Sequence, residues 1–213
     1  MVICRRSEVK DVVDSICKNH NLLKLITPSY VAKLAFTVMK MDIRDDEIWF
    51  SLADYLAKHH TQFDLRGTST YLMALHHASK YSPITMDFSE EFTMLELPII
   101  QKLEDSNGDH ASLTQIVSTY SKAQLGSVEF FSALEKFIQA YLEESQDGPS
   151  AKISEDALII QNENSKPREF KAIEVANLMY SYASNENCSN DILDDLTPVM
   201  AAKIPGLKSN EMK

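Results

Sequence analysis

The segment ASLTQIVSTYSKAQLGSVEFFSALEKFIQAYLE, residues 111–143, indicates the fold class of this chain. Apolar residues recur every three or four positions on both sides of a turn at Gly126-Ser127, which is the spacing of two amphipathic helices. Because only a few residues separate the two helices, they must pack in antiparallel orientation. We therefore predict a helical hairpin, with helices over 111–122 and 127–143.

The apolar frame of this hairpin recurs in two other segments. The spacing between its members is the same in all three sets, which are Ile116, Phe130, Leu134, Ile138; Leu34, Ile48, Leu52, Leu56; and Leu178, Ile192, Leu196, Met200. Leu75 lies midway between Leu34 and Ile116 and marks a further repeat. A fixed period of about 41 residues is typical of stacked helical hairpins.

The first hairpin has clear start signals. Thr27 and Pro28 fit the N-cap and the first position of a helix, and Asp45-Asp46 fits the start of its partner. We expect the inward stripe of the first helix to be Tyr30, Leu34, Val38 and Met41. The remaining elements expected are a leading helix over 7–20 and two hairpins with helices over 68–80 and 90–104, and over 169–184 and 190–202.

The predicted architecture is one all-α domain over 1–202, a short right-handed α-solenoid of about four antiparallel hairpins. Residues 145–167 are polar and are expected to be an insertion, because the frame resumes in register after them. Their one apolar knot, Leu158, Ile159 and Ile160, is a candidate contact with a neighbouring protein. Residues 203–213 are expected to be a flexible tail.

The charge of the chain is unevenly distributed. The formal net charge is −10, from 21 basic and 31 acidic residues. Proteins that bind nucleic acid through phosphates usually carry a basic excess on one face, and the overall balance points the other way. Residues 1–40 have a local excess of basic residues, so Arg5, Arg6 and Lys10 are the candidate RNA contacts.

The compartment is only loosely constrained by the sequence. Three cysteines without a C-x-x-C spacing fit a reducing environment, and no apolar run is long enough to span a membrane. The segment over 1–25 does not resemble a secretory signal. It is expected to be an ordinary first helix, with a basic amphipathic targeting helix as the alternative.

No active site is apparent in the sequence. The pairs His59-His60 and His76-His77 point in different directions on a helix and have no zinc-like partner spacing. Acidic pairs such as Asp194-Asp195 are expected at helix ends, and the glycines are too scattered for a phosphate-binding loop. We therefore expect no catalytic residue, no cofactor, no metal and no small-molecule substrate.

Aromatic residues are the remaining candidates for recognition. Aromatic side chains can stack on the bases of single-stranded RNA, but half of those considered fall on the apolar frame and are expected in the core. Phe50 and Tyr180 lie off the frame. They are the aromatic residues expected at the surface, as candidate partner contacts.

Two segments resemble a known repeat class. They are Ile116 to Glu135 and the run from Val175 to Ala183, VANLMYSYA. They are similar to the degenerate helical-hairpin repeats that precede RAP domains in FAST-kinase-like and octotricopeptide-type organellar proteins. That resemblance, which spans about residues 27–202, implies an RNA-binding factor in mitochondria or chloroplasts. The chain has no counterpart of the RAP domain, and its array is shorter and more acidic than that of an RNA reader.

The function expected from these features is non-catalytic. The leading expectation is a scaffold or accessory subunit of a larger protein assembly. We expect that assembly in the mitochondrion, and the cytoplasm is the alternative location. The alternative is an organellar RNA-binding factor that uses the basic N-terminal region and the concave face. A basic face on the folded surface would favour RNA, and acidic faces with apolar patches would favour protein.

Overall fold

The computed structural model describes residues 6–81, 86–105, 109–146 and 169–204, and this part of the chain is helical without strands. Its ten α-helices and one 3-10 helix are α1 (Arg6–Cys17), α2 (His20–Leu23), α3 (Pro28–Lys40), α4 (Asp46–His59), η1 (His60–Gln62), α5 (Leu65–Tyr81), α6 (Ser89–Asp105), α7 (His110–Ala123), α8 (Val128–Gln146), α9 (Ala172–Ser184) and α10 (Asp191–Lys203).

The four predicted hairpins correspond to α3–α4, α5–α6, α7–α8 and α9–α10. The predicted leading helix over 7–20 is present as α1 but ends three residues earlier, because the chain breaks after Cys17 and restarts as the short helix α2. Asn19 explains the break: its side-chain oxygen accepts hydrogen bonds from the backbone N–H groups of Asn21 and Leu22, at 3.1 and 3.3 Å. An asparagine in this role caps a new helix. The insertion predicted from residue 145 lies almost wholly outside the described residues, as does the tail.

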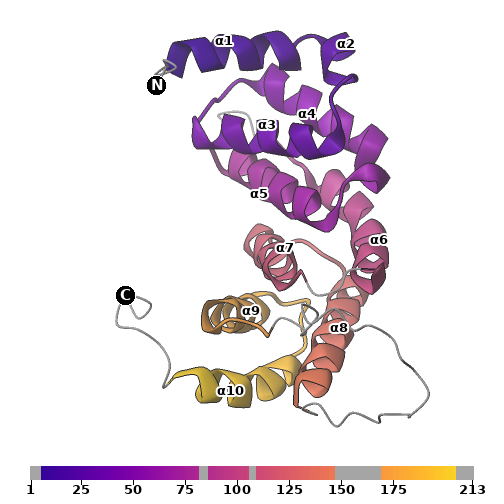
Figure 1. The fold of residues 1–213 in the computed structure, drawn as a ribbon, viewed down its shortest axis with the longest axis vertical. Helices are drawn as coiled ribbons and strands as arrows, with labels where there is room; N and C mark the ends of the chain where they lie inside the picture. Colours follow the sequence, from indigo (N-terminus) through magenta and orange to yellow (C-terminus); the bar gives the residue numbers. More distant parts are fainter. Residues whose placement is uncertain (1–5, 82–85, 106–108, 147–168, 205–213) are drawn as a thin grey trace, which may run out of the picture.

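The helices form two rows (Figure 1). The first helices of the hairpins, α3, α5, α7 and α9, pack side by side in succession and make the most extensive helix–helix contacts in the molecule. We call these four the inner row. The second helices, α4, α6, α8 and α10, are the outer row, and their contacts with one another are much sparser. Helices α1 and α2 cover the end of the stack at α3 and α4.

The predicted apolar frame forms the core. Ten of its twelve members are buried, as is Leu75, while Leu34 and Met200 are partly buried. Tyr30 was wrongly predicted to face inward, since its side chain is 63% exposed. Helix α3 instead buries a stripe rotated by one residue, which contains Val31, Ala32 and Ala35. These small residues allow close packing on α5, where a Cβ built on Gly67 would lie 3.8 Å from the Cβ of Ala32.

The two well-defined turns of the stack share one geometry. Asp42 after α3 and Gln124 after α7 both have positive φ, at 52° and 55°. In each case the next residue donates its backbone N–H to a carbonyl oxygen five positions back, from Ile43 to Val38 and from Leu125 to Tyr120, both at 3.1 Å. This is the Schellman motif. The two turns are separated by two periods of the repeat.

A second repeated feature is a hydrogen bond between a glutamate of one outer helix and a serine at the start of the next. Glu96 of α6 accepts hydrogen bonds from the backbone N–H and the hydroxyl of Ser127, at 3.0 and 2.5 Å, where α8 begins. One hairpin later, Glu135 of α8 accepts a hydrogen bond from the N–H of Ser189, at 3.2 Å, just before α10. Each carboxylate therefore lies at the positive end of the next helix.

Within the described ranges, every helix is too short or too polar to cross a bilayer. The prediction of no membrane-spanning helix is confirmed for this part of the chain.

Candidate functional site

The two rows of helices differ in net charge. The helices α3, α5 and α7 contain no acidic residue, and α9 contains only Glu174, which is buried. The outer row carries fifteen acidic residues against four basic ones, which leaves −11. The inner row carries five basic residues against one acidic residue, which leaves +4, and the five are Lys33, Lys40, Arg66, Lys80 and Lys122. An acidic protein thus presents a basic row.

The five basic residues of the inner row lack an acidic partner in the described part of the chain, and two of them lie over aromatic rings, Lys33 over Tyr30 at 4.9 Å and Lys40 over Phe36 at 5.3 Å. All five are exposed. Among the described residues, none of them has a carboxylate within 4.0 Å. Basic residues outside the inner row are paired more often: Lys58 contacts Asp54 at 2.6 Å, and Lys203 contacts Glu169 at 3.4 Å.

A groove of about 440 Å3 runs between α3 and the start of α5. Lys33 and Phe36 line it from α3, and Arg66 and Thr70 line it from α5. The one acidic residue in its wall, Asp64, accepts a hydrogen bond of 2.6 Å from the backbone N–H of Gly67 and so caps α5. The groove therefore offers two cations and one aromatic ring on a single surface.

Two more basic residues of the inner row, Lys80 and Lys122, lie on the neighbouring helices α5 and α7. The pKa of His76 is lowered by burial first, and then by the nearby positive charges of Lys80 and Lys122 and by His77. The charges on two different helices therefore act on one imidazole. Both lysines lie in the last turn of their helix, where a positive charge is favourable to the helix dipole. Helix stability accounts for their position, while their lack of an acidic partner leaves their charge available for binding.

The repeat register brings another set of residues to the same side. Phe36, His77, Ser118 and Tyr180 each lie two residues after the frame position of their inner helix. Ser118 is buried, and Phe36 and His77 are partly buried. Tyr180 is 66% exposed, and Ile173, two helical turns before it on α9, is also exposed. We use the name inner face for this side of the inner row, to which we assign Lys33, Phe36, Arg66, Lys80, Lys122 and Tyr180.

The candidate RNA contacts at the N-terminus do not form a basic patch within the described residues. Arg5 lies outside them, and only the backbone of Arg6 is described, as the first residue of α1. Lys10 is exposed and lines a groove that also contains Arg44, Asp42 and Asp45. Two carboxylates therefore balance the two basic groups there.

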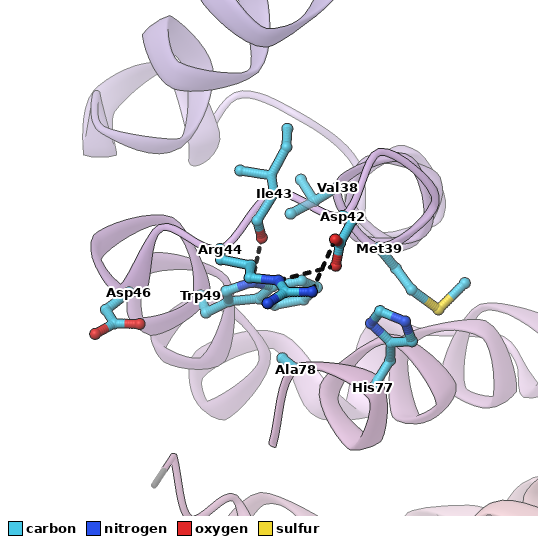
Figure 2. Close-up of a pocket in the computed structure, with 9 residues that line it drawn as sticks. All are labelled: Val38, Met39, Asp42, Ile43, Arg44, Asp46, Trp49, His77 and Ala78. Carbon is cyan, nitrogen blue, oxygen red and sulfur yellow. Dashed lines mark hydrogen bonds and ion pairs between the residues drawn. The ribbon is translucent and has the colours of Figure 1, made fainter. Parts of the chain in front are cut away.

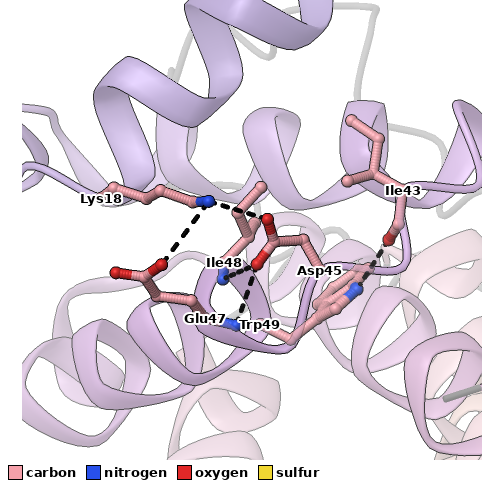
Figure 3. A network of polar contacts seen from close by, with 6 residues as sticks. All are labelled: Lys18, Ile43, Asp45, Glu47, Ile48 and Trp49. Atoms are coloured by element: carbon pink, nitrogen blue, oxygen red, sulfur yellow. Dashed lines mark hydrogen bonds and ion pairs between the residues drawn. The ribbon is translucent and has the colours of Figure 1, made fainter. Parts of the chain in front are cut away.

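Lys18 has a structural role at the same end of the molecule. Its ammonium group contacts Asp45 at 2.8 Å and Glu47 at 3.5 Å (Figure 3). Asp45 also caps α4, because its carboxylate accepts hydrogen bonds from the N–H groups of Glu47 and Ile48. The hydrogen bond from Lys18 is the largest cause of the lowered pKa of Asp45. This contact holds the leading helix on the first hairpin.

One small cavity lies between α3, α4 and α5 (Figure 2). Its volume is about 10 Å3, which is room for at most one water molecule. Arg44 and Asp42 form an ion pair of 3.0 Å across it, and the indole N–H of Trp49 donates a hydrogen bond of 3.0 Å to the carbonyl oxygen of Ile43. These contacts fix the turn after α3, and the cavity is too small for an organic substrate.

Possible metal ligands and nucleophiles are the remaining candidates for a functional site in the described residues. In the described part of the chain, no three His, Cys, Asp or Glu side chains are arranged to hold a metal ion. Cys17 is fully buried, and burial, with smaller effects of Asp14 and Asp45, raises the pKa of its thiol to about 12. Burial also raises the pKa of Cys188 to about 12. Both thiols are therefore poor nucleophiles.

The structure separates the predicted partner contacts. Phe50 is 56% exposed on α4, in the outer row, whereas Tyr180 belongs to the inner face. Leu158, Ile159 and Ile160 lie outside the described residues. A role of any of these residues in binding stays a prediction.

Sequence reasoning missed two features. The absence of acidic residues from three consecutive inner helices was visible in the sequence, and counting charge helix by helix would have found it. His110 was also missed. It is 2% exposed and packs against the rings of both Tyr141 and Phe170, with centroids 4.0 and 4.2 Å away. That packing joins residues far apart in the chain, so no local pattern signals it.

Comparison with known proteins found no match, whether to a family model, a curated protein or a solved structure. The resemblance to FAST-kinase-like and octotricopeptide-type repeats therefore stays a prediction.

Proposed function

We propose that this protein is a non-catalytic scaffold or accessory subunit of a larger assembly, and that it binds its partners through helical-repeat surfaces. The observation that carries the proposal is the separation of charge between the two rows, with five exposed cations of the inner row that lack an acidic partner among the described residues. An extended surface of this kind suits recognition of another macromolecule better than chemistry on a small one. The resemblance to organellar repeats favours a mitochondrial assembly.

We further propose that the stack is a short α-solenoid with the inner row on its concave side. In a curved stack of two layers, the helices on the concave side lie closer together than those on the convex side. The extensive contacts within the inner row and the sparse contacts within the outer row fit that geometry. Concave faces of such repeats are extended binding surfaces.

The first end of the stack carries apolar groups that support residence in an assembly. Leu25 is 81% exposed, and Leu22 and Tyr30 are exposed nearby in the sequence. Terminal repeats of stable solenoids normally have polar outer faces. An apolar end is therefore a candidate contact with a neighbouring subunit.

RNA binding is the second candidate, because a basic row is the surface feature expected of an RNA factor. Its cations belong to the inner row, whereas the sequence pointed to Arg5, Arg6 and Lys10. Helix α9 weighs against it, because this last helix of the inner row contains no Lys or Arg and the row is therefore not basic along its whole length.

Gradient sedimentation of the tagged protein from its own cells, with and without ribonuclease, tests the proposal. The expected result is a large particle that resists ribonuclease and contains other proteins in stoichiometric amounts. A particle that falls apart on ribonuclease treatment would instead support the second candidate function, RNA binding. A free species of 24.1 kDa would overturn both.

A further inference from the structure

We propose that the inner face binds an acidic, amphipathic segment of a partner protein, most simply a helix. This inference rests on the scaffold function proposed above and names the chemistry of the partner. It depends on three properties of the inner face, which are its charge, its apolar residues and its length.

Charge is the first property. Lys33 and Arg66 lie on opposite walls of the α3–α5 groove, and Lys80 and Lys122 lie in the last turns of the neighbouring helices α5 and α7. None of the four has an acidic partner among the described residues. A partner with Asp or Glu side chains would complement these cations, which mainly determines specificity and the rate of association.

Apolar surface is the second property, and its aliphatic member Ile173 favours protein over nucleic acid, whereas the aromatic Phe36 and Tyr180 suit either ligand because aromatic rings also stack on bases. Phe36 is partly buried in the α3–α5 groove, and Tyr180 and Ile173 are exposed on α9, which has no basic residue. A phosphate backbone has nothing to bury against an isoleucine. An amphipathic helix has apolar side chains that do, and burying them contributes about 25 cal/mol per Å2.

Length is the third property. Packed helices lie about 8–10 Å apart, so the four helices of the inner row span about 25–30 Å from the first axis to the last. A helix of about 20 residues is about 30 Å long. One helix of ordinary length therefore reaches from the groove beside Lys33 to Tyr180.

The two ends of the inner face differ, which sets the orientation of the partner. Basic residues lie on α3, α5 and α7, and the exposed apolar pair Ile173 and Tyr180 lies on α9. The acidic part of the partner segment lies over the first three helices, and its most apolar part lies over α9.

The test uses the full chain and three fluorescent probes of matched length. The first is a synthetic amphipathic helix of about 20 residues, with Leu at every third or fourth position and Glu on the other face. The second replaces each Glu by Lys, and the third is a single-stranded oligouridine. Binding is followed by fluorescence anisotropy at low and physiological salt.

Two double variants separate the inner face from overall charge. Lys33→Glu/Arg66→Glu changes the inner face, and Lys58→Glu/Lys136→Glu changes exposed lysines of α4 and α8 in the outer row. Each pair makes the protein more negative by the same amount. Circular dichroism and the melting temperature show whether each variant is folded.

The acidic helix is expected to bind the unmodified chain more tightly than the other two probes do. The inner pair should weaken that binding by about tenfold or more and the outer pair by less than about threefold. Ile173→Ser/Tyr180→Ser should weaken it without changing its dependence on salt. Absence of binding by the acidic helix, or equal weakening by the inner and outer pairs, would overturn the inference.

Tighter binding of the oligouridine, with the same sensitivity to the inner pair, would identify nucleic acid as the ligand and would also overturn the inference. The sedimentation experiment keeps the two proposals distinguishable. A large ribonuclease-resistant particle together with no binding of the acidic helix would leave the scaffold function standing and remove only this partner.

Discussion

The hydroxyl of Tyr120 in α7 donates a hydrogen bond of 2.7 Å to the backbone carbonyl oxygen of Phe92 in α6. Both residues are buried, and their rings meet edge to face with centroids 5.0 Å apart. This contact joins the second hairpin to the third. Tyr182 occupies the equivalent position one hairpin later, four residues after the frame leucine, and its buried hydroxyl has no hydrogen-bond partner among the described residues.

The two tyrosines should respond differently to loss of the hydroxyl. Tyr120→Phe removes a buried hydrogen bond and should lower the free energy of unfolding by about 1 kcal/mol. Tyr182→Phe removes an unsatisfied buried hydroxyl and should change it by less than about 0.5 kcal/mol, or increase it. Urea unfolding followed by circular dichroism measures both. Equal losses in the two variants would contradict the hydrogen-bonding difference.

Glu96→Ala should destabilise the junction between α6 and α8. The carboxylate of Glu96 accepts two hydrogen bonds from Ser127 at the start of α8, so its loss should cost about 1.5 kcal/mol. Glu104→Ala is the matched control, because Glu104 is exposed on the same helix. The same denaturation assay applies, and an equal effect of the two substitutions would show that the link to Ser127 is unimportant.

The ion pair of Lys18 with Asp45 should make stability depend on pH. The pKa of Asp45 is lower in the folded chain, so its contribution is fully present above the unfolded pKa of about 3.8 and is lost as the pH falls through the folded pKa. Asp45→Asn keeps a capping residue and removes the charge. The variant should be less stable than the unmodified chain at neutral pH, and the two melting temperatures should converge as the pH falls below that unfolded pKa.

Lys18→Met provides the control for this titration. It should reduce the effect of Asp45→Asn on the melting temperature, because the lysine is the main cause of the lowered pKa of Asp45. An effect of Asp45→Asn that is the same with and without Lys18→Met would assign it to the cap alone.

Cys17 should resist alkylation in the folded protein. Its pKa, raised from 9.0 to about 12, lowers the thiolate fraction at neutral pH by about a thousandfold, and burial blocks access as well. A chain with Cys4 and Cys188 replaced by Ala leaves Cys17 as the only thiol. Iodoacetamide labelling should be very slow without denaturant and fast in concentrated urea. Rapid labelling of the folded chain would contradict the packing of α1 on α4.

Periodicity explains why the hairpins were predictable. Burial repeats with the helical period, so the frame of Ile116, Phe130 and Leu134 identifies its own inward face. Tyr30 shows where that reasoning fails. Helix α3 buries the small residues Ala32 and Ala35 in place of the larger tyrosine, and Ala32 lies against Gly67 of α5. Periodicity predicts an apolar face to within about one residue, and the neighbouring helix selects the final rotation.

The inner face was less predictable than the hairpins. Lys33, Arg66 and Lys122 lie far apart in the chain, and only the stacking of α3, α5 and α7 brings them to one side. The overall charge of −10 concealed them, because the outer row outweighs the inner row. Reading charge after assigning alternate helices to two layers would have revealed the separation.

Photo-crosslinking in living cells is the decisive test of partner binding at the inner face. A photoreactive amino acid in place of Thr70, which lines the α3–α5 groove, is compared with one in place of Lys136, which is exposed on α8. We expect a discrete protein adduct from position 70 that survives ribonuclease, and little or none from position 136. Adducts from position 136 alone, or an adduct from position 70 that ribonuclease removes, would refute binding of a partner protein at this face.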